Sequence, residues 1–220
     1  MADSAQMTEL SLEAWEEGRG IDFEDEQAKQ AYQERAGRFA DAIRLEEPDR
    51  VPVNLLSTFY PAFHKGITPE TAMNDAEALS EALIYFVDDL EPDVFPWTST
   101  LIPSAKALEM VDYEVFDWPG DGSSPDTVYQ AKEDDYMEAD DYDALISDPT
   151  DYFLRNYVPE AFGALQGLDQ LPPFTGLTCG IAGVHPFLLP FGLPPVREAL
   201  ETLIEAGEEA LRWQQIVGGT

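Results

Sequence analysis

The stretch RFADAIRLEEPDRVPVNLL, residues 38–56, joins the end of a helix to the first strand and decides the fold. Its first part continues a helical period of apolar residues: Ala36, Phe39, Ala40 and Ile43. Pro48 forces Glu47 out of the helical region, so the helix is expected to stop by Leu45 or Glu46. Residues 51–56 then form a short apolar strand, in which Pro52 is tolerated near the start or at an edge. A charged turn leading into a strand that helices must cover is how a βα barrel often opens.

The neighbouring elements extend this pattern. A helix is expected over 24–45, with one face formed by Ala28, Ala31, Tyr32, Arg35, Phe39 and Ile43. The most regular helix ends at Leu90, and Asn74-x-x-Glu77 resembles a capping box at its start. A second strand is expected at 93–100.

Shorter helices are expected between and after these elements. Residues 57–65 end at Gly66, a natural helix stop, and Thr68 caps a second short helix that has Pro69 in its first turn. A third short helix is expected over 103–111. All of them are brief, so they connect the longer elements.

The second half of the chain is expected to be less regular. Strands at 113–118 and 127–132 flank a hairpin loop. The acidic segment 133–143 could be a calcium loop or the solvated start of a helix. Its spacing does not match a twelve-residue calcium loop, so we favour the helix. Helices are expected at 148–157, continuing from Pro159 to Gly167, and at 196–217, with an irregular loop over 168–195 between them.

Composition restricts the partners and the compartment. The net charge of −32 disfavours nucleic acid and anionic membranes as partners. Only four of the twelve basic residues are lysine, a pattern typical of a halophilic, acidic protein whose self-repulsion is screened by salt. A polybasic partner is the alternative, but the acids are spread along the whole chain. The single cysteine, Cys179, and the lack of a secretory pattern in the first residues indicate a cytoplasmic protein.

Four motifs resemble the uroporphyrinogen decarboxylase family. They are Arg44-x-x-Glu47-Pro-Asp-Arg-Val-Pro-Val, residues 142–155, Phe191-Gly-Leu-Pro, and Leu203-Ile-Glu-Ala-Gly-Glu-Glu-Ala. The resemblance spans roughly residues 28–220 and is nearer the methyltransferase branch, whose enzymes use zinc and corrinoid proteins. It implies the N-terminal part of a (β/α)8 TIM barrel, helix-rich, with extra N-terminal helices and a hairpin excursion. Tetrapyrrole lyase activity and a non-catalytic binding or assembly module are the alternatives.

The expected domain organisation is an acidic arm over 1–22 and an incomplete barrel over 23–220. A complete barrel of this type needs eight strands, and only 51–56 and 93–100 are convincing barrel strands. Complete members of the resembled family continue past the point matching Thr220. The chain is therefore expected to need a second chain or a C-terminal half, or to form a homo-oligomer. A truncated gene, a split protein and a fragment all stay open.

Ligands of such barrels bind at the carboxyl ends of the strands. The candidate substrate-binding residues are therefore those that end the two strands: Asn54, Ser57, Thr58, Tyr60, Trp97, Thr98 and Ser99. No catalytic residue and no metal ligand is assigned. Cys179 and His185 lie close together in the sequence, but two ligands do not make a zinc site. His64 is expected to sit at a helix end.

The sequence differs from that of the decarboxylases after the first expected strand. Their arginine-rich signature after the first strand suits a substrate with many carboxylates. Here Asn54-Leu-Leu-Ser-Thr-Phe-Tyr-Pro stands in its place, and Arg50 lies before the strand. A polycarboxylate porphyrinogen is therefore disfavoured as the substrate.

Overall fold

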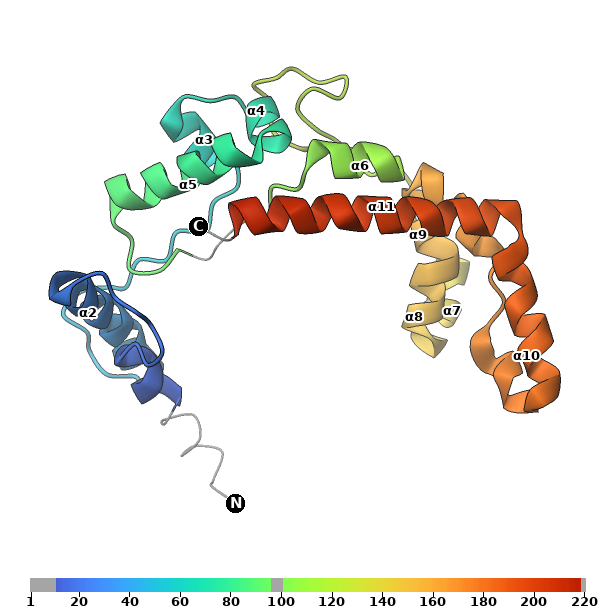
Figure 1. Ribbon diagram of the computed structural model, residues 1–220, viewed down its shortest axis with the longest axis horizontal. Coiled ribbons are helices and arrows are strands. Elements are labelled where there is room, and N and C mark those ends of the chain that lie inside the picture. Colours follow the sequence, from blue (N-terminus) through green and yellow to red (C-terminus); the bar gives the residue numbers. More distant parts are fainter. Residues whose placement is uncertain (1–10, 96–100, 219–220) are drawn as a thin grey trace. The chain divides into compact units, whose positions relative to one another are not determined.

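The computed structural model describes residues 11–95 and 101–218, and these residues are predominantly helical (Figure 1). They group into two compact units. The first unit contains residues 1–57 and 85–98, and the second contains residues 58–84 and 99–220. The expected boundary between residues 22 and 23 stays a prediction.

The first unit is built on helix α2 (Glu26–Ile43). The Asp25 carboxylate caps it by accepting a hydrogen bond from the Ala28 N–H at 2.8 Å. The helix ends at Ile43, and Leu45 takes a left-handed conformation with φ of 62°. The stop before Pro48 is therefore confirmed. The expected burial of Ile43 is wrong, because its side chain is 55% exposed, while Ala36 and Ala40 are buried.

The N-terminal segment packs on α2 in the part that is described. Residues 11–16 are helical. The Tyr32 hydroxyl donates a hydrogen bond to the Trp15 carbonyl at 2.8 Å, and the Arg44 guanidinium holds the Glu16 carboxylate at 2.6 Å. This ion pair keeps the pKa of Glu16 below its ordinary value.

Helix α5 (Ala76–Leu90) belongs to both units, with residues up to Ile84 in the second and residues from Tyr85 in the first. The helix expected through Leu90 is confirmed, but its expected cap is wrong. Asn74 is the last residue of the preceding helix and binds the Glu70 carbonyl. Asp75 supplies the cap instead, by accepting from the Ala78 N–H at 2.9 Å.

The two expected barrel strands pair at one point in the described residues. Asn54 and Val94 form an isolated parallel bridge, and the described residues on either side of it belong to no regular helix or strand. Residues 96–100 of the second expected strand lie outside the described residues. A TIM barrel is therefore not shown, and the established description is a helix-rich chain with few strands.

The second unit begins with three short helices: α3 (Tyr60–Lys65), α4 (Pro69–Asn74) and α6 (Ala105–Val111). Gly66 ends α3 at φ of 84°, a conformation that favours glycine, and the Thr68 hydroxyl caps α4. Strands β1 (Phe116–Asp117) and β2 (Gln130–Ala131) form the expected antiparallel hairpin, with Phe116 opposite Ala131. The helix end at Gly66, the Thr68 cap and the hairpin are confirmed, but the strands are shorter than the expected 113–118 and 127–132.

Short helical segments fill residues 139–192. They are η1 (Ala139–Asp141), α7 (Tyr142–Ser147), α8 (Pro149–Tyr152), η2 (Phe153–Tyr157), α9 (Val158–Ala161), η3 (Gly163–Gln170), η4 (Phe174–Cys179), α10 (Ile181–Leu188) and η5 (Leu189–Gly192). The irregular loop expected over 168–195 is wrong for α10, which keeps its helical form with Pro186 inside it. The helix expected to continue to Gly167 stops at Ala161, where Phe162 becomes extended.

Helix α11 (Pro194–Val217) organises the second unit and runs beside α6 (Figure 1). The core between α11, α6 and η3 consists of Val111, Leu165, Leu168, Leu171, Val196, Ala199 and Ala206. Gly167 allows the closest approach, because a Cβ there would lie 2.2 Å from the Pro195 carbonyl oxygen. A buried polar contact adds specificity, since the Trp213 indole N–H donates to the Ile102 carbonyl at 2.9 Å.

None of the helices in residues 11–95 and 101–218 combines the length and the apolar character needed to cross a bilayer.

Candidate functional site

The first candidate residues lie where the two extended segments pair. Beside the Asn54–Val94 bridge, the Leu55 N–H donates to the Val94 carbonyl at 3.2 Å, and the Val94 N–H donates to the Val53 carbonyl at 3.1 Å. Asn54 itself is exposed. The parallel direction places the carboxyl ends of both segments at the same edge.

A buried carboxylate fixes this pairing at the opposite, amino-terminal edge. Asp93, whose side chain is fully buried, accepts hydrogen bonds from the Arg50 guanidinium at 2.6 Å, the Arg38 guanidinium at 2.9 Å and the Val53 N–H at 2.8 Å. Burial alone would raise the pKa of Asp93, but these donors hold that pKa below its ordinary value. Asp49 completes the cluster with two hydrogen bonds from Arg38.

Sequence reasoning missed this cluster, although its parts were visible. Asp49 and Arg50 were recognised as a charged turn, and Asp93 as the start of the second strand. The missing signal was the burial of Asp93, because a buried carboxylate must find cationic or N–H partners. Its partners come from three places in the first unit: Arg38 of α2, and Arg50 and the Val53 N–H of the segment after it.

Ser57 is the most informative of the candidate residues. Its hydroxyl oxygen is buried and has no hydrogen-bond partner among the described residues. An unsatisfied buried hydroxyl costs about 1 to 3 kcal/mol. The residue follows the first extended segment at its carboxyl end, where a ligand or a further part of the fold would supply the partner.

The other candidate residues are divided between the units or lie outside the description. Ser57 closes the first stretch of the first unit, whereas Thr58 and Tyr60 belong to the second unit. Thr58 is exposed, and the Tyr60 ring stacks on the His64 ring at 5.9 Å between centroids. His64 lies in the last turn of α3, as expected. Trp97, Thr98 and Ser99 lie outside the described residues.

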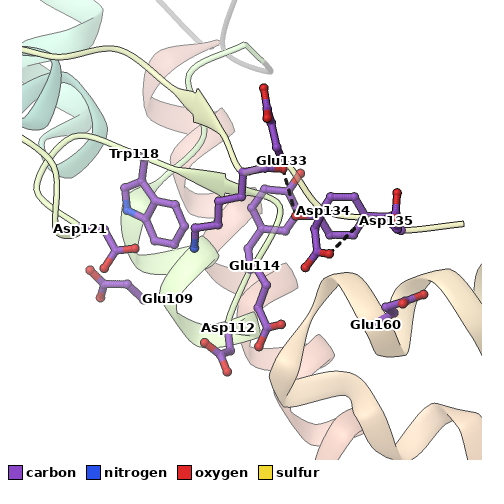
Figure 2. Close-up of a pocket in the computed structure, with 12 residues that line it drawn as sticks. Glu109, Asp112, Glu114, Trp118, Asp121, Glu133, Asp134, Asp135 and Glu160 are labelled. Atoms are coloured by element: carbon purple, nitrogen blue, oxygen red, sulfur yellow. Dashed lines mark hydrogen bonds between the residues drawn. The ribbon is translucent and has the colours of Figure 1, made fainter.

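A second site, not foreseen from the sequence, is an acidic cleft of about 660 Å³ in the second unit (Figure 2). Its lining residues come from the end of α6, the hairpin, the following acidic segment and α9: Glu109, Asp112, Tyr113, Glu114, Trp118, Asp121, Lys132, Glu133, Asp134, Asp135, Tyr136 and Glu160. Burial raises the pKa of Tyr113, so this phenol stays neutral. The sequence could not reveal the cleft, because tertiary folding brings Glu160 to residues 109–136.

The carboxylates of this cleft do not converge. Figure 2 shows them spread around its wall, and the single cationic side chain there, Lys132, pairs with Asp117 at 3.0 Å. In the part of the chain that the structure describes, no group of three or more His, Cys, Asp or Glu side chains is placed to hold a metal ion. The excess of carboxylates makes the electrostatic potential of this cleft negative.

Cys179 and His185 are both exposed, and they belong to different helical segments. Cys179 ends η4 and is exposed, and His185 is exposed on α10. Neither joins a group of potential metal ligands within the described residues.

Comparison with known proteins found no matching family model, no similar curated protein and no similar solved structure.

Replacing Ser57 with alanine should stabilise the chain or leave its stability unchanged, because the substitution removes a buried hydroxyl that has no partner. The expected gain is about 1 kcal/mol. Urea unfolding followed by circular dichroism measures it, with Ser147→Ala, an exposed serine of α7, as the control. A loss above about 1 kcal/mol would mean that the hydroxyl makes a stabilising contact.

Proposed function

We propose that the chain is the N-terminal part of a (β/α)8-barrel enzyme of the uroporphyrinogen decarboxylase family, of the branch that transfers methyl groups between corrinoid proteins and thiols. In this proposal residues 51–56 and 93–100 form two neighbouring barrel strands. Their carboxyl ends, with Asn54, Ser57, Thr58, Tyr60, Trp97, Thr98 and Ser99, bind the substrate. The chain contributes one wall of the active site and is not a catalyst alone.

The parallel bridge between Asn54 and Val94 is the observation that carries the proposal. Parallel neighbours need a long crossover, and here the crossover contains the helices α3, α4 and α5. A strand, a helical crossover and a parallel strand make the repeating unit of a βα barrel. The motif Arg44-x-x-Glu47-Pro-Asp-Arg-Val-Pro-Val, which supports the resemblance, supplies Arg50 to the Asp93 cluster at the base of this unit.

Exposed apolar side chains support the view that more of the barrel covers these strands. Val51 is 82% exposed and Leu56 is 69% exposed, although both belong to an apolar strand pattern. Edges and faces of this kind associate with further strands. We therefore propose a second chain, a C-terminal half or another copy of the chain as the partner, in the cytoplasm of a salt-adapted cell. Nucleic acid and membranes are not proposed as partners, because the charge of −32 opposes both.

The residues that the structure describes do not fit the zinc ion that the proposed branch uses. Such a site needs three protein ligands, and no described group of His, Cys, Asp or Glu side chains provides them. We propose that the zinc ligands and the contacts with the corrinoid protein lie in the remainder of the enzyme. No step of the reaction is therefore assigned to a metal here.

Reconstitution tests the proposal directly. The full chain is mixed with a polypeptide that carries the remaining strands and the proposed zinc ligands, then supplied with zinc, a methylated corrinoid protein and a thiol. Loss of the methyl–cobalt absorbance and formation of the thioether are measured together. We expect turnover for the mixture only, and a fall of tenfold or more for Ser57→Ala, about 1.4 kcal/mol in the barrier.

Three outcomes would contradict the proposal in different ways. Turnover by this chain alone would show that its own residues complete the active site. Decarboxylation of a porphyrinogen by the mixture would favour a tetrapyrrole lyase. Tight assembly without any turnover would favour a binding or assembly module. Ser147→Ala serves again as the matched control, because α7 lies away from the strand ends in sequence and its serine is exposed.

A further inference from the structure

Arg35, a half-buried arginine of the first unit, forms no ion pair with any residue that the structure describes. The chain contains eight arginines and 44 acidic residues. Among the described residues, the other seven arginines each form an ion pair with a carboxylate: Arg19, Arg38, Arg44, Arg50, Arg155, Arg197 and Arg212. Arg35 forms none. Its guanidinium is partly removed from water without the ion pair that usually offsets this cost.

Arg35 lies between two cavities of different character. On one side is an apolar cleft of about 510 Å³, lined by Trp15, Ala28, Ala31, Tyr32, Ala36, Val87, Pro92, Asp93, Val94 and Phe95 together with Arg35. On the other side is a polar groove of about 350 Å³, lined by Gln27, Ala31, Glu34, Arg38, Arg50 and Glu91 together with Arg35. The apolar cleft has the size of a small-molecule site.

The apolar cleft exists because of the side chains on one face of α2. Ala28, Ala31, Tyr32 and Arg35 belong to the face that the sequence predicted would be buried. In the structure this face is lined by small side chains and opposed by Trp15 and Phe95, so it remains open. The walls are held in place, since Tyr32 binds the Trp15 carbonyl and the Phe95 ring packs on Phe86 with centroids 5.7 Å apart.

The charges around the cleft select the head group of a ligand. Arg38 and Arg50 are occupied by Asp49 and Asp93, so Arg35 is the arginine left to bind an anion. Glu34 and Glu91 in the adjacent groove oppose a doubly charged group such as a phosphate. A single carboxylate matches one guanidinium, with which it forms two parallel hydrogen bonds.

We propose that this cleft binds a small organic monocarboxylate, with its carboxylate on Arg35 and an aromatic or branched apolar body between Trp15, Val87 and Phe95. Asp93 lies in the wall of the cleft, and none of the four described strand-end candidates, Asn54, Ser57, Thr58 and Tyr60, lines it. Binding at Arg35 needs neither the missing strands nor a metal.

Binding of 3-phenylpropanoate to the full chain tests the proposal, with the uncharged amide 3-phenylpropanamide as the matched ligand. Backbone amide shifts of isotope-labelled protein report where and how tightly each binds. We expect saturable shifts at Ala28, Ala31 and Val94 for the acid, and at least tenfold weaker binding for the amide. Arg35→Gln should weaken binding of the acid at least tenfold. Arg35→Lys should give an intermediate affinity, because lysine keeps the positive charge but cannot donate two parallel hydrogen bonds to one carboxylate.

Arg197→Gln is the control variant, because it removes the same charge from an exposed helix of the second unit. Equal affinity for acid and amide, an equal effect of Arg197→Gln, or shifts outside the cleft would each overturn the proposal. The amide comparison uses the unaltered protein, so a misfolded variant would not obscure the result. Since binding and not turnover is measured, failure here leaves the methyl-transfer proposal untouched, and the reverse also holds.

Discussion

Replacing Asp93 with asparagine is expected to lower the stability of the first unit by about 3 to 5 kcal/mol. The carboxylate is fully buried and neutralises two guanidiniums, of which Arg38 is itself only 15% exposed. The substitution leaves both cations without this partner and weakens the bond to the Val53 N–H. The paired segments around Asn54 and Val94 should therefore separate first.

Hydrogen exchange followed by mass spectrometry measures this effect unit by unit. Peptides covering residues 26–43 and 51–57 should lose protection in Asp93→Asn, and peptides of α11 should not. Asp88→Asn removes one negative charge from an exposed position of α5 and serves as the control. Unchanged protection in the first unit would mean that the arginines find replacement partners within it.

Replacing Glu209 with glutamine should destabilise the second unit in a pH-dependent way. Glu209 is buried and accepts hydrogen bonds from Arg212 at 2.8 Å and from the Ser104 hydroxyl at 2.8 Å. The Arg212 bond, with help from Ser104 and Lys106, lowers the pKa of Glu209 to about 2. The expected loss at neutral pH is about 2 kcal/mol, allowing for the solvent exposure of Arg212 and Lys106.

The pH range of this effect follows from the lowered pKa. The stabilisation is fully present above the ordinary carboxyl pKa of 4.5 and is lost as the pH falls towards 2. Between these values the unfolded state binds a proton at Glu209 and the folded state does not, so acid favours unfolding. Urea unfolding of the wild type and Glu209→Gln should differ most at pH 7 and converge as the pH falls from 4.5. Glu208→Gln, an exposed neighbour, is the control. A difference independent of pH would assign the role of Glu209 to shape and not to charge.

Local signals explain which parts of the fold could be predicted. The Thr68 hydroxyl caps α4 and the Gly66 backbone ends α3, and both act on neighbouring residues only, so the short helices could be predicted. The predicted cap of α5 was wrong by one residue, because Asn74 and Asp75 are both residue types that cap helices. Asn74 ends α4 and binds the Glu70 carbonyl, so Asp75 caps α5. Helix α10 was missed because Pro186, which lies inside it, argues against a helix.

The sites were harder to foresee, for a physical reason. Asn54 and Ser57 follow directly from the position of a strand end, and strand ends can be located in a sequence. The Asp93 cluster and the open cleft at Arg35 depend on which charges become buried together. Burial is a property of the tertiary structure, so Arg35 looked like one more member of an amphipathic helix.

The order of the first unit along the chain has a consequence for how the protein folds. Residues 58–84 of the second unit interrupt the first, so Val53 and Asp93 must close a loop of 40 residues to form their bond. During synthesis Arg38 and Arg50 emerge well before the carboxylate that will neutralise them. Loop closure is easier once α3 and α4 have formed, because helices shorten the flexible chain between the ends. The first unit is thus expected to reach its native state late, because its arginines and the Val53 N–H have no Asp93 carboxylate to bind until the loop has closed.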